Sequence, residues 1–393
     1  MGGDEGREVD VDASAGHVLV ACDKFKGTLT APEVADLVEQ GLRRAAPSVP
    51  VRSVPVADGG DGTLDALRAA GLSSVPLRVS GPTGEPVDTS YVADAGTAVV
   101  ELADACGLQH LPGHELAPLT ASSYGLGEAV RAALDAGYRR IVIGAGGSAS
   151  SDGGAGMLSA LGAVLTDADG RELVRGGGAL TDLAHLDLSG LHPALAAAEL
   201  VLACDVVNPL LGPSGAVAVY GGQKGAAGAV AAQLEAGLER WAAVVEQVTG
   251  AQAADQPGAG AAGGVGFGAL AVLGATARSG VDLVLDLVGF ADLLVGARLV
   301  ITGEGALDVQ TLAGKAPVGV ARAAAGVTTV AVCGRSELTP DEVRHAGFAQ
   351  VYALTEIEPD RERCLREAGP LLRRLSAVIA GTWLADPRPA GTR

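Results

Sequence analysis

Apolar runs alternate with helical patterns near the N-terminus. Residues 17–22 and 51–56 are apolar segments that predict buried strands. Between them, Thr30-Ala-Pro-Glu33 is a capping-box pattern with proline in the first turn, which predicts a helix running to about Ala46. A further helical pattern follows the second strand. This alternation of strand and helix is typical of a parallel sheet.

The same alternation returns near the C-terminus. Strands are expected over residues 299–302, 328–333 and 350–354, and helices over residues 317–325, 340–346 and about 361–384. Between the two ends the pattern differs, because residues 75–102 read as short strands joined by hairpin turns such as Asp94-Ala-Gly96. The middle of the chain therefore predicts a separate domain.

We predict an α/β protein of two α/β domains. Residues 17–75 and 290–385 would form a discontinuous Rossmann-like domain, with a parallel sheet built from both chain ends. Residues 76–289 would form an inserted α/β domain, and residues 1–16 and 386–393 flexible tails.

Charge and composition exclude several classes of partner. The chain has 393 residues with a formal net charge of −18, and 3% of its residues are aromatic. It lacks the basic field of proteins that bind nucleic acid or anionic membranes, and the aromatic platforms on which bases stack. The five cysteines are odd in number and form no Cys-x-x-Cys pair, which indicates a reducing compartment. The acidic start does not resemble a signal peptide, so we expect a cytoplasmic protein.

Lysine is scarce, and its positions are informative. Only four of the 28 basic residues are lysine: Lys24, Lys26, Lys224 and Lys315. A coding bias towards arginine would explain the scarcity itself. Lysine should then persist mainly where a compact ammonium group is needed, as it is beside phosphate.

A long glycine-rich loop follows the predicted strand 141–143. In residues 144–156 the glycines leave backbone N–H groups bare, and these groups favour an anion. The loop also contains the weak dinucleotide pattern Gly-x-Gly-x-x-Ala from Gly144 to Ala149, with Asp167 about where a ribose-binding acid could lie. These residues are compatible with three alternatives: a phosphate-binding loop, a nicotinamide-dinucleotide site and a simple tight turn.

Polar side chains follow several predicted strands. They are Asp23 and Lys26; Asp58 and Asp61; Asp205 and Asn208; and Glu304, Asp308, Gln310 and Lys315. Ligands of open α/β sheets bind at the carboxyl ends of the strands. Carboxylates there can hold Mg²⁺ or accept a proton, and lysines can neutralise phosphate. Singly, each acid could instead cap a helix; together they favour a phosphate-handling site.

The ordered motifs resemble those of the bacterial glycerate kinase family over residues 17–384. They are Asp23-Lys-Phe-Lys-Gly-Thr-Leu29, Ala57-Asp-Gly-Gly-Asp-Gly-Thr63, Gly146-Gly-Ser-Ala149 with Asp152-Gly-Gly154, Cys204-Asp-Val with Asn208, Gln223-Lys-Gly-Ala226, residues 258–264, and Thr302-Gly-Glu-Gly305 with Asp308, Gln310 and Lys315. Lys24 stands where the family often has serine, and Gly222 where a proline usually precedes Gln-Lys.

The resemblance implies ATP-dependent phosphorylation of D-glycerate with Mg²⁺. It favours 2-phosphoglycerate as the product and leaves 3-phosphoglycerate open. An NAD(P)-dependent dehydrogenase of a small hydroxy acid and a non-catalytic ligand-sensing relative are the alternatives. D-glycerate is the expected partner, without nucleic acid or membrane, and a homo-oligomer is left open.

Together with the strand-end positions, the resemblance predicts the site residues. Catalytic roles are predicted for Asp205, Lys26, Lys224 and Asp58. Substrate or phosphate binding is predicted for Asp23, Lys315, Ser148, Asp152, Asn208, Gly146, Gly147, Gly263, Gly264 and Gln310. Contacts to Mg²⁺ are predicted for Asp205, Glu304 and Asp308.

Overall fold

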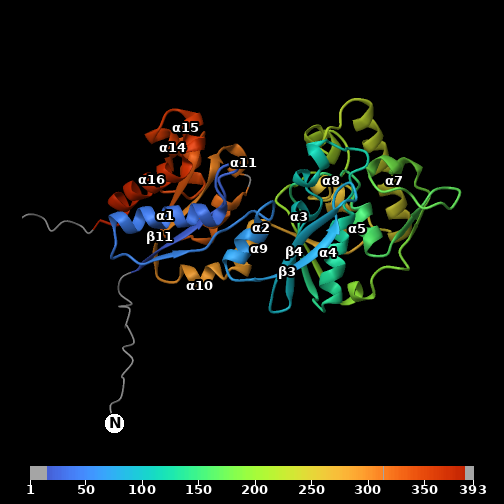
Figure 1. The fold of residues 1–393 in the computed structure, drawn as a ribbon, viewed down its shortest axis with the longest axis horizontal. Coiled ribbons are helices and arrows are strands. Elements are labelled where there is room, and N and C mark those ends of the chain that lie inside the picture. The colour runs from blue at the N-terminus through green and yellow to red at the C-terminus, as the bar shows by residue number, and fades with distance from the viewer. Residues whose placement is uncertain (1–15, 313, 386–393) are drawn as a thin grey trace, which may run out of the picture. The chain divides into compact units, whose positions relative to one another are not determined.

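The computed structural model describes residues 16–312 and 314–385, which divide into two compact units (Figure 1). Within this range, unit 1 comprises residues 16–54, 289–312 and 320–385, and unit 2 comprises residues 55–288 and 314–319. The predicted tails lie outside the described residues, except for Gly16. No helix in the described part is long and apolar enough to cross a membrane.

Unit 1 contains a five-stranded sheet built from both ends of the chain. Its order is β13-β12-β11-β1-β2, with β1 at His17–Cys22, β2 at Val51–Ser53, β11 at Ala297–Leu307, β12 at Thr329–Ser336 and β13 at Gln350–Ala353. Every neighbouring pair is parallel. The prediction of a parallel sheet shared by the two chain ends is confirmed. Strand β2 is shorter than predicted, and the last backbone hydrogen bond to β1 is donated by Val54 N–H to the Val20 carbonyl at 2.8 Å.

Helix α1 (Ala31–Ala45) packs against α16 (Ala368–Trp383), beside it in Figure 1. The predicted capping box forms: Glu33 N–H donates to the Thr30 hydroxyl, and the Glu33 carboxylate accepts from Thr30 N–H at 2.8 Å. The helices approach closely at Gly41, where a Cβ atom would collide with the carbonyl oxygen of Arg373. Here glycine is needed for packing rather than for backbone freedom.

The single helix predicted over residues 361–384 is wrong, because the structure has two. Helix α15 (Arg361–Arg366) ends before α16 begins. Pro370 explains the break, because it has no N–H group for the carbonyl of Arg366 and its ring would clash with that carbonyl in a continuous helix. The remaining helices of the C-terminal part are α10 (Phe290–Leu294), α11 (Val309–Leu312), α12 (Ala316–Ala323), α13 (Pro340–His345) and α14 (Leu354–Ile357).

Unit 2 contains a six-stranded mixed sheet and a small two-stranded sheet. The large sheet has the order β10-β9-β6-β5-β4-β3, with β3 at Ser73–Ser80, β4 at Pro86–Asp94, β5 at Thr97–Glu101, β6 at Arg140–Gly144, β9 at Glu199–Ala203 and β10 at Thr276–Arg278. Strands β3, β4 and β5 are antiparallel, and the others are parallel. The small sheet pairs β7 (Val164–Thr166) with β8 (His185–Asp187). The predicted hairpin turn forms at Ala95 and Gly96, which both have positive φ.

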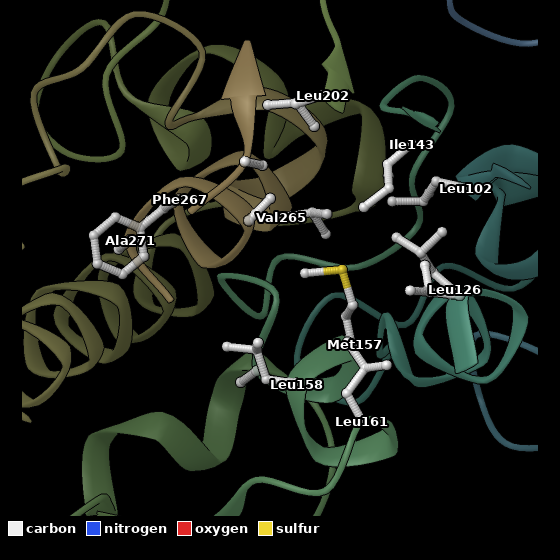
Figure 2. Close-up of a cluster of buried hydrophobic side chains, with 14 of the residues drawn as sticks. Leu102, Leu126, Ile143, Met157, Leu158, Leu161, Leu202, Val265, Phe267 and Ala271 are labelled. Carbon is white, nitrogen blue, oxygen red and sulfur yellow. The ribbon is translucent and has the colours of Figure 1, made fainter. Parts of the chain in front are cut away.

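Helices cover the faces of this sheet and close its core. They are α2 (Thr63–Ala69), α3 (Leu102–Cys106), α4 (Tyr124–Asp135), α5 (Ala155–Ala160), α6 (Ala216–Tyr220), α7 (Ala229–Thr249), α8 (Ala261–Ala271) and α9 (Gly280–Leu287). Figure 2 shows the Met157 side chain of α5 among Leu126, Ile143 and Val265, all of them fully buried. This core anchors α5 and α8, the helices that follow two glycine-rich tracts.

The first boundary between the units lies at residue 55, whereas we predicted it at 75. Helix α2 belongs to unit 2, because it packs against β4 and β5. Its first turn is also bound by a side chain of unit 2, since Gly62 N–H and Leu64 N–H both donate to the Glu101 carboxylate. The segment that carries Asp58 is therefore part of the inserted unit.

Candidate active site

The loop 144–156 leaves β6 and reaches α5 by a long path. Leu108 N–H donates to the Gly147 carbonyl at 3.1 Å, and Ala149 N–H donates to the Cys106 carbonyl at 3.0 Å, so the loop first pairs with residues next to α3. Ser148 closes the next turn, because its hydroxyl accepts from Ser150 N–H at 3.1 Å. A dinucleotide fingerprint needs a tight turn directly from strand to helix.

That dinucleotide geometry does not form here. Helix α5 begins only at Ala155, well beyond Ala149. Asp167 is occupied in its own turn, where Oδ1 accepts from Asp169 N–H and Arg171 N–H, both at 2.9 Å. Neither part of the weak pattern has the arrangement that a nicotinamide dinucleotide requires, and the dehydrogenase alternative is not supported.

Asp152 holds the loop in place from inside the protein. Its side chain is fully buried. Oδ2 accepts from Ser123 N–H at 2.8 Å, from the hydroxyls of Ser122 and Ser123, and from Gly156 N–H, while Oδ1 accepts from Gly154 N–H. The carboxylate thereby ties the start of α5 to the start of α4. These five hydrogen bonds hold the loop in place, and the predicted binding role of Asp152 stays a prediction.

Lys224 reaches the loop from another segment. It lies in the short turn η5 (Gly222–Lys224), is 3% exposed, and its Nζ donates to the Ser150 carbonyl at 2.5 Å. Burial lowers the pKa of Lys224 to about 8, although the negative charge of Asp152 acts in the opposite direction. An ammonium group has three donors. Lys224 can therefore bind Ser150 and still donate to an anionic ligand.

Three glycine-rich segments meet in unit 2. A Cβ atom at Gly146 would lie 2.6 Å from the Cα atom of Gly60, and one at Gly263 would lie 2.8 Å from Lys224 Nζ and collide with the Ser150 carbonyl oxygen. Gly264 is equally confined, since its Cβ would lie 2.8 Å from the Cα atom of Gly153. The segments 58–62, 144–156 and 258–264 are thus packed backbone against backbone.

Replacing Gly263 with alanine tests this packing. Gly263 has a φ of +68° as well as no room for a side chain. We expect Gly263→Ala to lower the free energy of unfolding by about 1–3 kcal/mol, measured by urea denaturation. The matched control is Gly222→Ala, because a Cβ atom at Gly222 meets nothing within 4 Å. Equal stability of the two variants would contradict the close approach of these segments.

Asp205 follows β9 and lies at the N-terminus of α9. Its Oδ1 accepts from Gly280 N–H at 3.0 Å, while its Oδ2 is buried without a hydrogen-bond partner among the described residues. Burial and the negative charge of Asp58 raise the pKa of Asp205 to about 6, against the lowering effect of hydrogen bonds from Ser279 and Gly280. The site therefore presents two neighbouring carboxylates, one with an unused acceptor.

Asn208 connects the segment after β9 to the glycine-rich tract before α8. Its Nδ2 donates to the Ser214 carbonyl at 2.8 Å, its Oδ1 accepts from the Tyr220 hydroxyl at 2.7 Å, and its backbone carbonyl accepts from Gly260 N–H at 2.9 Å. These contacts position Asn208 beside the segments that carry Asp205 and Gly263.

A second group of predicted residues lies in unit 1, at the ends of β1 and β11. Asp23 N–H donates to the Gly303 carbonyl at 2.8 Å, and Lys26 follows in an exposed turn. Glu304 lies within β11, not in a loop after it, because the strand continues past the residue 302 at which we predicted its end. Its Oε1 accepts from the Thr311 hydroxyl at 2.6 Å.

Asp308 and the residues after it complete this group. Asp308 Oδ1 accepts from Gln310 N–H at 2.8 Å at the start of α11, and the Gln310 side chain is exposed. Lys315 belongs to the short segment that groups with unit 2. The predicted site residues are therefore distributed over both units.

The predicted metal contacts divide in the same way. Asp205 lies in unit 2, and Glu304 and Asp308 lie in unit 1. Within the described residues, no group of three or more His, Cys, Asp or Glu side chains is placed to hold a metal ion. Mg²⁺ in phosphoryl-transfer enzymes commonly uses one or two carboxylates and completes its shell with phosphate oxygens and water. The unpartnered Oδ2 of Asp205, with Asp58 nearby, fits that requirement.

Sequence reasoning missed Glu101 and Ser279. Glu101 ends a buried strand and is 3% exposed, and Ser279 is the N-cap residue of α9 and acts to lower the pKa of Asp205. Both have the signal that pointed to the other site residues. Glu101 is a polar residue at the end of an apolar run, and Ser279 is a polar residue directly before a helix.

Comparison with known proteins identifies the family. Residues 18–384 match the model of the glycerate kinase family. The chain belongs to this family. A glycerate kinase of Bacillus subtilis is 41% identical over 370 residues, which cover 93% of this chain and 97% of the relative. The glycerate 2-kinase of Escherichia coli is 40% identical over 379 residues, covering 95% of this chain and 100% of the relative.

A solved structure has the same fold. It is the crystal structure of a protein from Salmonella typhimurium provisionally described as glycerate kinase 2. It has a TM-score of 0.81 and 40% sequence identity, and the match covers 94% of this chain and 98% of that chain. The resemblance drawn from the motifs and the α/β fold class are both confirmed.

Proposed function

We propose that this glycerate kinase family enzyme transfers the γ-phosphoryl group of ATP to D-glycerate. The observation that carries the proposal is the buried Lys224 ammonium group, bound to the glycine-rich loop through the Ser150 carbonyl. Phosphate and glycerate are anions, so a site for both needs local positive charge in a chain with a net charge of −18. The relatives named above support the choice of glycerate.

The residues of unit 2 have distinct tasks in this reaction. Phosphoryl transfer needs mainly positioning and neutralisation of charge. Lys224 would donate to a phosphate or to the substrate carboxylate, and the bare N–H groups of the loop 144–156 would cradle the same anion. Asp205 would accept the proton of the reacting hydroxyl at Oδ2. A pKa of about 6 makes it a better base than an ordinary aspartate.

Mg²⁺ is proposed as the cofactor of ATP. When bound, it would neutralise charge on the phosphates. Asp58 is the carboxylate of unit 2 that would hold it, with Asp205 in that role only if it is not the base, and Glu304 and Asp308 are the candidates in unit 1. We expect excess EDTA to abolish turnover and added Mg²⁺ to restore it, as measured by ADP release. Full turnover in the presence of the chelator would contradict this role.

The 2-hydroxyl group is the proposed acceptor, as the name of the Escherichia coli relative suggests. The decisive experiment incubates the protein with ATP and D-glycerate and identifies the product by ³¹P NMR, with NAD⁺ and D-glycerate in parallel. We expect 2-phosphoglycerate. Formation of 3-phosphoglycerate would overturn only the choice of hydroxyl, whereas the absence of any phosphoglycerate would overturn the function. A cytoplasmic location is also proposed, since ATP is available there and all five cysteines are unpaired.

A further inference from the structure

Glu101 is a buried acid at the end of β5. Its side chain is 3% exposed, and burial, Asp104 and Asp61 together raise its pKa to about 8. Acidic residues are rarely this buried unless their oxygens are bound. Here both oxygens are bound: Oε1 accepts from Gly62 N–H at 2.9 Å, and Oε2 accepts from Leu64 N–H at 3.1 Å.

The Gly62 amide ends the segment 58–62, which carries Asp58, and the Leu64 amide lies in the first turn of α2. Gly62 is in the left-handed region and is the N-cap residue of α2, with no side chain to cap the helix. The first N–H groups of a helix have no partner within it. Glu101 supplies that partner from a neighbouring strand, so it replaces a missing cap and fixes the segment 58–62 at its C-terminal end.

The sheet of unit 2 places Glu101 at the same edge as Gly144 and the residues that follow β9. Glu101 is in register with Gly144, and Gly144 is in register with Ala203, two residues before Asp205. The anchored segment in turn lies against the same elements. A Cβ atom at Gly144 would lie 2.8 Å from the Gly59 carbonyl oxygen, and one at Gly280 would collide with the Asp58 carbonyl oxygen.

We propose that Glu101 is a positioning residue, which anchors the segment 58–62 and so sets the place of Asp58 beside Asp205. This inference rests on the proposed function, because Asp58 and Asp205 are the carboxylates assigned to the reaction. Glu101 itself acts through its two backbone hydrogen bonds. Its effect on catalysis therefore depends on Asp58.

The variant Glu101→Gln tests the anchor with little change in shape. A carboxyl group can accept with both oxygens whether or not it is protonated, whereas the amide nitrogen of glutamine is only a donor. One of the Gly62 and Leu64 amides would then face a donor. The matched control is Glu128→Gln, since Glu128 Oε2 also accepts from a backbone amide, that of Ser80, at 2.6 Å in the same unit.

Hydrogen exchange measures the anchor independently of turnover. We expect the amides of Gly62 and Leu64 to exchange at least about tenfold faster in Glu101→Gln, and at the wild-type rate in Glu128→Gln. Unchanged protection in Glu101→Gln would overturn the anchor. This readout holds even if the wild-type protein does not phosphorylate glycerate, so the two proposals fail separately.

A double-mutant cycle with Asp58→Asn measures the consequence for catalysis. In the wild-type background, we expect Glu101→Gln to lower kcat/KM at least about tenfold and Glu128→Gln to change it less than about twofold. In the Asp58→Asn background, Glu101→Gln should lower kcat/KM by less than about a further twofold, because the carboxylate that Glu101 positions is already lost. If Glu101→Gln and Asp58→Asn instead lower kcat/KM by independent factors that multiply in the double variant, the positioning role is wrong. If Glu101→Gln does not fold, Glu101→Asp replaces it, with the same expectations for exchange and for the cycle.

Discussion

Replacing Lys224 with methionine is expected to lower kcat/KM for D-glycerate phosphorylation by about 10²- to 10³-fold, the usual effect of removing one donor that stabilises transition-state charge. Methionine is unbranched and apolar, so it fills the buried position while the charge is lost. The Lys224 ammonium group is buried in unit 2 and donates to the Ser150 carbonyl of the glycine-rich loop. Steady-state kinetics with both substrates varied would measure the loss.

The pH dependence of the wild-type enzyme provides a second test of Lys224. Because the pKa of Lys224 is lowered from 10.5 to about 8, its charge is lost as the pH rises through 8, and kcat/KM should fall there. The free energy of unfolding should instead rise over this pH range. Between pH 8 and 10.5 the unfolded chain binds a proton that the folded chain does not, so this group makes the free energy of unfolding rise with pH. In Lys224→Met both effects should disappear.

Two outcomes would remove Lys224 from the mechanism. One is a kcat/KM of Lys224→Met within about threefold of the wild-type value. The other is an unchanged decline in activity above pH 8 in that variant. Lys224→Arg is the accompanying control, because it retains the charge but needs more room beside Gly263. It should recover only part of the activity.

Asp205→Asn is expected to lower kcat by at least about 10²-fold while the KM for ATP changes little. Asparagine can still accept from Gly280 N–H through its own Oδ1, so the local fold is retained. What is lost is the basic Oδ2, which is buried and has no hydrogen-bond partner among the described residues. An acceptor without a partner in the folded protein is available to a substrate proton or to a metal ion.

The matched control for Asp205 is Asp286→Asn. Asp286 also lies in unit 2 but pairs with Arg278 at 2.8 Å on an exposed surface, where an ion pair adds little. It should retain wild-type kinetics. A wild-type kcat in Asp205→Asn would exclude Asp205 from the reaction. A strongly increased Mg²⁺ requirement in that variant would instead assign Asp205 to the metal.

Features that depend on neighbouring residues were predictable from sequence. The capping box of Thr30 and Glu33 and the turn at Ala95 and Gly96 each need only a few consecutive residues, and both formed as predicted. The break before α16 also has a local signal, Pro370, although we predicted one continuous helix across it. The extension of β11 to Leu307 could not be read locally, because pairing with β12 stabilises it across two glycines.

The family, the α/β class and the sheet shared by both chain ends were predictable from the printed residues, because periodicity, caps and motifs lie in short segments and the order of the motifs can be read along the chain. Only the packing of distant segments shows which site residues have polar atoms available to a ligand. Lys224 and Ser150 are 74 residues apart, and Gly62 and Glu101 are 39 apart, so neither contact has a local signal. Packing also gives Asp152 five hydrogen-bond donors, whereas Oδ2 of Asp205 has no hydrogen-bond partner among the described residues. Burial and hydrogen-bond partners are set by packing between distant segments, and therefore the two aspartates look alike in sequence.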